Sequence, residues 1–333
     1  MNLTILGAGA WGTALACSLA ERHPVVLWGR NQVAIQRAAA QRDISTVLPG
    51  VPLPAGVQLS SDVDFALAHC RSQPDGLLLV ATSVAGLRPI ARQLAQHDVV
   101  HLVWLCKGFE EGSAKLPHQI VADELGEDFP CGALSGPSFA LEVARGQPAA
   151  LTIASRHAAL REQVVRAVHG PRLRVYASDD VIGVEVGGAV KNILAIATGI
   201  VDGLALGLNA RAALITRGLA EITRLGVALG GRSETFMGLA GVGDLILTCT
   251  GDLSRNRQVG LALAAGKPLA TIVAELGHVA EGVRCAQAVR TLALQLGVDM
   301  PIAVAVAEVL FDGVALPEMV QRLLSREARS EAL

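Results

Sequence analysis

Short apolar runs alternate with amphipathic segments over the first half of the chain. Continuous apolar runs are typical of strands buried on both faces of a parallel sheet, and such alternation with helical segments predicts a doubly wound, mostly parallel α/β sheet. We expect helices at residues 88–96, 139–145 and 157–168. We expect strands at residues 2–6, 25–28, 77–81, 99–105, 133–135, 150–153 and 173–176.

The pattern changes after about residue 180, where apolar residues recur at helical spacing and no further strand is expected. The predicted helices are residues 180–206, 210–229, 233–239, 255–265, 271–276, 285–296, 301–310 and 317–324. We therefore expect two domains, residues 1–180 and residues 181–333, the second of them all-helical. Glu185, Lys191 and Asp202 interrupt its longest apolar stretch, whereas a membrane helix needs about 18 or more apolar residues in a row. We interpret this stretch as a buried helical core.

Composition supports a large buried core. Of the 333 residues, 51% are hydrophobic and 17% are charged, against a usual charged share of about 25%. We expect some of the apolar surface to be covered in a subunit interface. The formal net charge of −2 gives no electrostatic reason to expect nucleic acid binding or a membrane patch.

The cysteines and histidines form no recognisable metal or redox motif. Cys17, Cys70, Cys106 and Cys131 lie in apolar surroundings, and none of the six cysteines forms a CxxC pair. We expect reduced, buried thiols, and no metal site because the histidines lack HxH or HExxH spacing. Reduced cysteines indicate a cytoplasmic location. The apolar N-terminus lacks the basic region of a signal peptide, and the glycine motif lies inside its apolar stretch, so we do not expect a signal peptide.

A glycine motif directly follows the first predicted strand. In the sequence GAGAWG at residues 7–12, Gly7 would permit a tight turn, Gly9 would let a pyrophosphate approach the backbone, and Gly12 would let the helix lie close to the strand. The free N–H groups of the following helix would then face the phosphates. The motif favours a nicotinamide-dinucleotide site in a Rossmann-type domain. A packing turn or a methyltransferase-type loop remains the alternative.

The end of the second predicted strand bears on the cofactor type. NAD-specific sites usually carry an acidic residue there, but this strand ends Trp28-Gly29-Arg30-Asn31. Arg30 could pair with a 2′-phosphate, which favours NADP(H), or use of both NADP(H) and NAD(H). A solvated surface arginine is the alternative. Trp11 could cover the pyrophosphate or could simply pack.

Lys191 is the leading candidate for proton transfer. It lies in the middle of a predicted apolar helix, where an ammonium is costly unless it has a partner or a function. Burial or a neighbouring cation would lower its pKa from about 10.4 toward the working pH of a general acid or base. A lysine that extends to solvent at a domain edge is the alternative.

Further candidates follow strands or begin helices. Lys107 comes directly after a predicted strand, at the edge where ligands bind in this fold, and the sequence SGPS at 135–138 follows another strand. Asp244 lies beside a glycine-rich turn, where it is either an active-site acid or a helix cap.

The sequence SRNR at 254–257 predicts the start of a helix capped by Ser254. Arg255 and Asn256 would lie in its first turn, beside free N–H groups, and so could bind a phosphate. An ordinary capped surface helix is the alternative.

Taken together, these motifs resemble bacterial NAD(P)-dependent glycerol-3-phosphate dehydrogenase, from the first strand to about residue 320. The Lys191-Asn192 element alone is shared with other dehydrogenases, whereas the later segments are more specific. The resemblance is carried by residues 7–14, 104–108, 135–140, 188–192, 209–218, 238–245, 248–250 and 254–257.

The resemblance implies a cytoplasmic homodimer that interconverts dihydroxyacetone phosphate and sn-glycerol 3-phosphate with NAD(P)H, for phospholipid synthesis, without membrane insertion. It makes Lys191 the proton donor and acceptor, with Lys107 and Asp244 beside it. It implies substrate contacts from Lys107, Gly136, Ser138, Lys191, Asp244, Ser254, Arg255 and Asn256. It implies cofactor contacts from Gly7, Gly9, Trp11, Gly12, Arg30, Lys107, Ala140, Arg255, Val279 and Glu281.

Two positions depart from the family pattern: Ala10 replaces a commoner serine, and Trp11 replaces a commoner Phe or Tyr. Two other functions stay open. A 2-ketopantoate or β-hydroxyacid reductase has the same architecture and uses lysine and asparagine similarly, but would not be expected to place SRNR after Gly243-Asp244. A non-catalytic NADP-binding sensor is disfavoured by the intact set of Lys107, Lys191 and Asp244.

Overall fold

The computed structural model describes residues 1–276 and 280–325, which divide into two compact units. The sheet unit comprises Met1–Cys106 and Pro117–Val181, and the helical unit comprises Lys107–Leu116 and the chain from Ile182 onward. The predicted single boundary at residue 180 would place residues 107–116 in the first domain. Their contacts group them instead with the helical unit, because Phe109 and Leu116 are buried in its core.

One sheet of eight strands forms the centre of the sheet unit, in the order β3-β2-β1-β4-β5-β6-β7-β8. All neighbouring strands are parallel except β6 and β7. The predicted doubly wound, mostly parallel sheet is confirmed. The strands are β1 (Leu3–Leu6), β2 (Val25–Trp28), β3 (Val57–Ser60), β4 (Leu77–Val80), β5 (Leu102–Trp104), β6 (Cys131–Ser135), β7 (Ala149–Ala154) and β8 (Leu173–Ser178).

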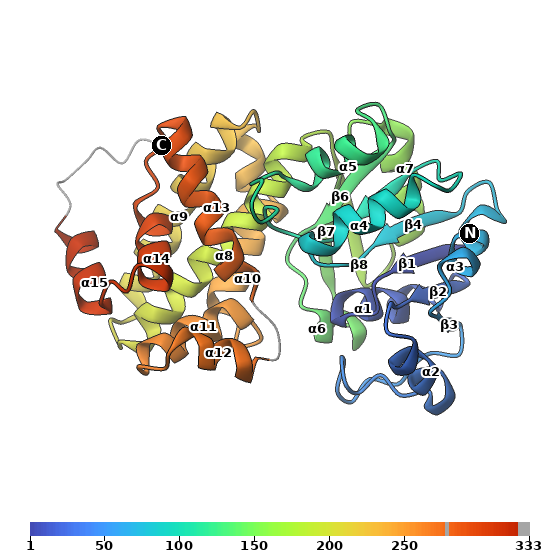
Figure 1. The fold of residues 1–333 in the computed structure, drawn as a ribbon, viewed down its shortest axis with the longest axis horizontal. Helices are drawn as coiled ribbons and strands as arrows, with labels where there is room; N and C mark the ends of the chain where they lie inside the picture. Colours follow the sequence, from blue (N-terminus) through green and yellow to red (C-terminus); the bar gives the residue numbers. More distant parts are fainter. Residues whose placement is uncertain (277–279, 326–333) are drawn as a thin grey trace. The chain divides into compact units, whose positions relative to one another are not determined.

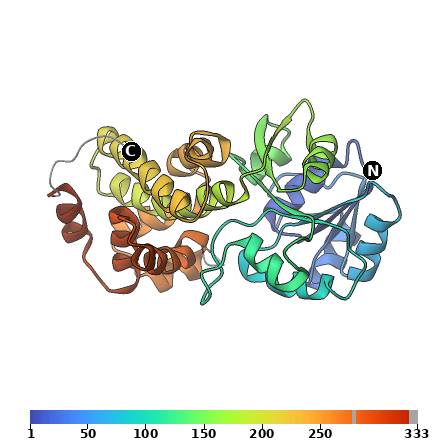
Figure 2. The same ribbon diagram turned by 90° about the horizontal axis from the view of Figure 1, so that it is seen from above.

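Helices cover both faces of this sheet (Figure 1, Figure 2). The apolar side chains of one face, including Leu3 and Ile5 of β1, form a continuous core with the helix that follows the glycine motif. On the other face, the Thr4 hydroxyl donates to the carbonyl of Ala66, which anchors α3 on β1. The helices of this unit are α1 (Ala10–Leu19), α2 (Gln32–Gln41), α3 (Val63–Arg71), α4 (Val84–Leu94), α5 (Pro117–Leu125), α6 (Ala140–Ala144) and α7 (Ala158–Val168).

Two strands differ from the prediction. The predicted strand at 99–105 is shorter, because only Leu102–Trp104 pairs with its neighbours, and Val100 is exposed. The edge strand β3 was not predicted: of its four residues only Val57 is buried, so the continuous apolar signal of a central strand is missing. The expectation for the cysteines was partly wrong, since Cys106 and Cys131 are half-buried rather than buried.

Over the part of the helical unit that the structure describes, every regular element is a helix, as predicted (Figure 1). They are α8 (Val181–Gly203), α9 (Leu208–Ala228), η1 (Ser233–Met237), η2 (Leu239–Gly243), α10 (Asp244–Thr250), α11 (Arg255–Ala264), α12 (Leu269–Glu275), α13 (Glu281–Leu296), α14 (Pro301–Phe311) and α15 (Leu316–Leu324). By length and composition α8 could cross a membrane, but 94% of its most apolar window is buried inside the protein. It is the central helix of this unit's core, and its residues from Val184 to Val201 are buried almost without interruption.

Candidate active site

The glycine motif forms the turn that a pyrophosphate requires. Gly7 has φ of +127°, and a Cβ on Gly12 would lie 2.0 Å from the carbonyl oxygen of Gly7, so α1 packs directly on the turn. A Cβ on Gly9 would meet no atom within 4 Å, and no side chain caps the helix that begins after it. The backbone N–H groups at the start of α1 therefore border open space, and these residues fit a dinucleotide.

Other predicted cofactor residues of the sheet unit lie at the ends of its strands or beside the turn. Arg30 is exposed, two residues after the end of β2. Trp11 is half-buried and packs on the sheet core, which supports the packing interpretation of this residue. Ala140 begins α6, a helix that contacts α1.

The predicted substrate residues Gly136 and Ser138 follow β6 in the sheet unit. Gly136 has φ of +142°, and a Cβ there would lie 2.8 Å from the carbonyl oxygen of Ala150 on β7. The Ser138 hydroxyl donates to the carbonyl of Gly136 at 3.1 Å. This turn is therefore fixed both by the neighbouring strand and by its own serine.

In the helical unit, close approach between backbones positions Lys191. A Cβ on Gly187 of α8 would lie 2.5 Å from the carbonyl oxygen of Ala240, so only glycine lets η2 lie this close to α8. Lys191 lies four residues, one helical turn, after Gly187, and Asp244 lies four residues after Ala240. The short π-helical turn η2 ends where α10 begins, at Asp244. Such turns occur frequently at functional sites.

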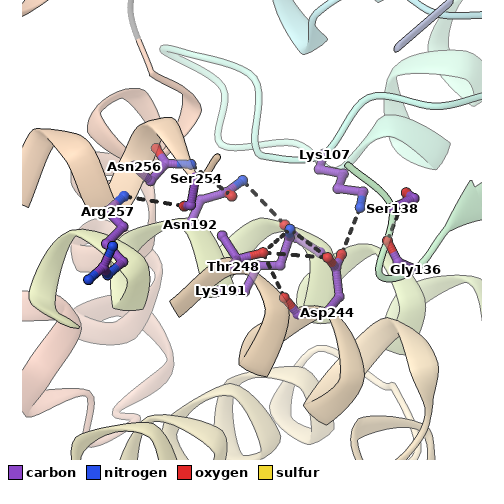
Figure 3. A network of polar contacts seen from close by, with 11 residues as sticks. Lys107, Gly136, Ser138, Lys191, Asn192, Asp244, Thr248, Ser254, Asn256 and Arg257 are labelled. Carbon is purple, nitrogen blue, oxygen red and sulfur yellow. Dashed lines mark hydrogen bonds and ion pairs between the residues drawn. The ribbon is translucent and has the colours of Figure 1, made fainter. Parts of the chain in front are cut away.

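Lys191 and Lys107 share one buried carboxylate (Figure 3). Lys191 Nζ donates to Asp244 Oδ1 at 2.8 Å and to Thr248 Oγ1 at 2.7 Å, while Lys107 Nζ donates to Asp244 Oδ2 at 2.7 Å. The Asp244 side chain is 2% exposed and that of Lys191 is 7% exposed. The Thr248 hydroxyl donates to the backbone carbonyl of Asp244, so its lone pair faces the lysine.

Burial and the neighbouring carboxylate act in opposite directions on the pKa of Lys191. Burial, together with repulsion from Lys107, lowers this pKa from 10.5 to about 8, while Asp244 opposes the shift. An ammonium with this pKa can give up and regain a proton near neutral pH. The interpretation of Lys191 as a side chain that extends to solvent is wrong, since the residue is buried.

Helix α11 packs on α8 just beyond the turn that carries Lys191. A Cβ on Gly260 would lie 2.1 Å from the carbonyl oxygen of Ile196, which shows how closely the two helices pack. Ser254 caps α11 as predicted, because its hydroxyl accepts from the N–H of Arg257 at 3.3 Å. Arg255 is exposed in the first turn.

The side chain of Asn256 connects α8 with α13. Its Nδ2 donates to Asn192 Oδ1 at 3.0 Å (Figure 3). Its Oδ1 accepts from the N–H of Gly282 at 2.9 Å. Glu281, the first residue of α13, is half-buried, and burial raises the pKa of its carboxyl while Lys107 and Arg255 oppose the shift. Val279, another predicted cofactor residue, lies outside the described residues.

Sequence reasoning missed Thr248 and gave no role to Asn192. Thr248 lies one helical turn after Asp244 and so shares a helix face with it, but this signal depends on a helix at 244–250 that was not predicted. Asn192 was noticed only as a neighbour of Lys191, and its contact is made by a residue 64 positions away. Among the described residues, no group of three or more His, Cys, Asp or Glu side chains could hold a metal ion.

A Rossmann-type sheet with an open glycine turn, together with a buried lysine whose pKa lies near neutrality, defines a nicotinamide-dependent dehydrogenase with a helical second unit. Comparison with known proteins narrows this class. A family model described as the NAD-dependent glycerol-3-phosphate dehydrogenase N-terminus matches residues 2–161, and one described as its C-terminus matches residues 180–321. The chain belongs to the NAD-dependent glycerol-3-phosphate dehydrogenase family.

Individual relatives are similar to this chain over nearly its whole length. The glycerol-3-phosphate dehydrogenase (NAD(P)+) of Herminiimonas arsenicoxydans is 70% identical over 331 residues, which is 99% of each chain. That of Paucimonas lemoignei is 68% identical and covers 100% of this chain and 99% of its own. The crystal structure of glycerol-3-phosphate dehydrogenase from Coxiella burnetii is similar with a TM-score of 0.92 at 40% identity, covering 98% of this chain and 99% of that chain.

Proposed function

We propose that this protein interconverts dihydroxyacetone phosphate and sn-glycerol 3-phosphate with NAD(P)H or NAD(P)+. The observation that carries the proposal is the buried Lys191-Asp244-Lys107 cluster on α8, α10 and the 107–116 segment, in a chain that belongs to this family throughout. A 2-ketopantoate or β-hydroxyacid reductase is not favoured, because the family matches cover both units.

Lys191 is the proposed acid and base of the reaction. A bound reduced nicotinamide would supply the hydride for C2 of the ketone. The Lys191 ammonium would give its proton to the carbonyl oxygen of the substrate. Asp244 and Thr248 accept hydrogen bonds from two of the three N–H groups of the Lys191 ammonium. The third N–H group would donate to a substrate oxygen. Asp244 therefore orients the ammonium, and Lys107 adds positive charge beside the developing alkoxide.

The remaining predicted residues are assigned by the same proposal. The start of α1 would hold the pyrophosphate, Arg30 a 2′-phosphate, and Trp11, Ala140 and Glu281 further parts of the dinucleotide. Gly136 and Ser138 would bind the substrate, and Ser254, Arg255 and Asn256 its phosphate. Support for the phosphate site comes from the exposed guanidinium of Arg255 beside the N-terminal N–H groups of α11.

The test is consumption of NADPH or NADH with dihydroxyacetone phosphate, compared with unphosphorylated dihydroxyacetone and with 2-ketopantoate. We expect turnover of the phosphorylated ketone, far weaker turnover of dihydroxyacetone, and none of 2-ketopantoate. Turnover of 2-ketopantoate in preference to the phosphorylated ketone would refute the assignment.

An Arg255→Ala variant tests the phosphate site separately. Loss of one charged partner of a desolvated anion typically costs about 2–5 kcal/mol, or roughly 30- to 5,000-fold in kcat/KM. We expect this loss for the phosphorylated ketone and almost none for dihydroxyacetone. An equal fractional loss of kcat/KM for both ketones would show that Arg255 does not bind the substrate phosphate.

The wider setting follows from the family. We infer a homodimer in the cytoplasm that supplies glycerol 3-phosphate for phospholipid synthesis. Light scattering on the purified protein tests the dimer, and a monomer at assay concentration would refute it.

A further inference from the structure

Lys107 begins a short segment that belongs to the helical unit, although the chain before and after it belongs to the sheet unit. The chain leaves the sheet unit after Cys106, contributes Lys107–Leu116 to the helical unit, and returns at Pro117. Lys107 therefore belongs to the same compact unit as its partner Asp244 and as Lys191. The geometry of the two lysines depends on what fixes this segment to the helical unit.

Two apolar side chains fix the segment. Phe109 is 4% exposed and Leu116 is 3% exposed, and both are part of the core built around α8 and α13. The backbone of Phe109 also shares a hydrogen bond with the buried thiol of Cys285 on α13. Phe109 is the closer anchor, only two residues after Lys107.

The segment is also closed by its own hydrogen bonds. The N–H of Glu110 donates to the carbonyl of Lys115 at 2.9 Å, and the N–H of Ala114 donates to the carbonyl of Glu110 at 2.9 Å. The Ser113 hydroxyl donates to the Glu110 carboxylate at 2.6 Å. Gly108, with φ of +137°, provides the backbone turn between Lys107 on Asp244 and Phe109 in the core.

We propose that Phe109 is a positioning residue, which anchors the 107–116 segment in the core of the helical unit and thereby keeps the Lys107 ammonium on Asp244, beside Lys191. The inference deepens the proposed function and rests on it, because it concerns the lysine that transfers the proton. The hydrogen bonds of Lys191 and Asp244 in the described residues do not involve Phe109. Phe109 therefore acts on Lys191 through the position of Lys107.

The charge environment of Lys191 makes this role measurable. Asp244 and Cys249 on α10, Lys107 on the segment and Glu281 on α13 act on its ammonium or are acted on by it, and Arg255 acts on Glu281. Lys107 is the cation among these groups that lowers the pKa of Lys191. If the anchor is lost, Lys107 spends less time on Asp244, and the pKa of Lys191 rises.

The experiment measures kcat for reduction of dihydroxyacetone phosphate against pH in the parent and in Phe109→Ala. Reduction needs the protonated lysine, so the rate falls on the alkaline side as Lys191 loses its proton. We expect Phe109→Ala to move this alkaline limb to higher pH by on the order of one unit. The matched control is Leu310→Ala on α14, which truncates a side chain buried in the same core and should lower stability while leaving the limb in place.

A double variant shows whether Phe109 acts through Lys107. Lys107→Met should move the alkaline limb in the same direction, and adding Phe109→Ala to it should move the limb no further, because coupled residues are not additive. If Phe109→Ala does not fold, Phe109→Leu is measured in its place, with a smaller shift of the same sign expected.

Two results would overturn the proposal: an unshifted limb in the folded Phe109 variant, or a full additional shift in the double variant. Failure of the proposed function is seen separately, because the parent would then not reduce dihydroxyacetone phosphate at all.

Discussion

Replacing Asp244 by asparagine removes the one carboxylate that Lys107 and Lys191 share while keeping the shape of the side chain. Asp244 is the carboxylate that raises the pKa of Lys191 against the effect of burial. Its oxygen lies 2.8 Å from Lys191 Nζ. At an effective dielectric constant of about 20, Coulomb's law gives roughly 6 kcal/mol at this separation, which is an upper bound for the net effect.

An opposite charge at hydrogen-bond distance typically changes a pKa by about 1–3 units. We therefore expect Asp244→Asn to lower the pKa of Lys191 from about 8 by about two units. In the assay with dihydroxyacetone phosphate, the alkaline limb of kcat should move to lower pH by that amount, opposite in direction to the Phe109 variants.

Asp244→Asn should also lower the unfolding free energy at low pH. Lys191 is buried with a depressed pKa, so its burial as an ammonium reduces stability at low pH, and a further depression makes this cost larger. The loss of unfolding free energy relative to the parent should be on the order of 3 kcal/mol well below the variant's pKa. This part of the loss, which comes from the charge of Lys191, should disappear as the pH rises above about 8 and Lys191 becomes neutral in both proteins. The loss of the ion pair between Lys107 and Asp244 remains at all these pH values.

Asp202→Asn is the matched control for both measurements. Asp202 is also largely buried in the helical unit and pairs with Arg257 at 2.8 Å and Arg211 at 3.1 Å. Its loss should reduce stability without moving the alkaline limb. If Asp244→Asn folds and keeps the parent's pH profile, Asp244 does not control the charge of Lys191 and the proposed mechanism is wrong.

Three further predictions follow from other parts of the chain. Lys191→Ala should lose turnover by about 10²–10⁴-fold with little change in cofactor affinity, and a kcat within a few-fold of the parent's would show another proton donor. Arg30→Ala should weaken NADPH binding by about 1.5–3 kcal/mol and NADH binding far less, as measured by fluorescence titration; equal losses would exclude a 2′-phosphate contact. Burial raises the pKa of Glu221 to about 7, although it accepts the N–H groups of Ile302 and Ala303 at 2.7 and 3.1 Å. It thus contributes stability below its unfolded pKa of about 4.5 that is lost as pH rises through about 7, and Glu221→Gln should flatten the change in urea-unfolding free energy between these pH values, by about 3 kcal/mol at most.

The fold was predictable from the sequence because its main signals are local. Buried parallel strands such as Leu77–Val80 are continuous apolar runs. Ser254 is a residue type that favours the first position of a helix, and it does cap α11. The glycine motif also predicts its structure locally, because the turn and the helix α1 follow each other directly in the sequence. The edge strand β3 was missed because only one of its four residues is buried. The helix α10 was missed because it follows a π-helical turn between glycines.

The candidate site was only partly predictable, because its geometry depends on contacts between distant segments. Lys191 was recognised by its apolar surroundings, but that its pKa lies near 8 depends on Lys107 and Asp244, 84 and 53 residues away along the chain. No local pattern indicates that residues 107–116 join the helical unit, because the chain on either side of them belongs to the sheet. Both features depend on tertiary packing between segments that are distant in the sequence.

The position of this pKa suits a reaction that runs in both directions. Reduction of the ketone requires an ammonium that gives up a proton, and oxidation of the alcohol requires an amine that takes one. Burial and the charge of Lys107 lower the pKa of Lys191, whereas Asp244 raises it, and the balance of these effects lies at about 8. At neutral pH about one molecule in ten then carries the amine form, so in the proposed mechanism both the acid and the base form of Lys191 are populated.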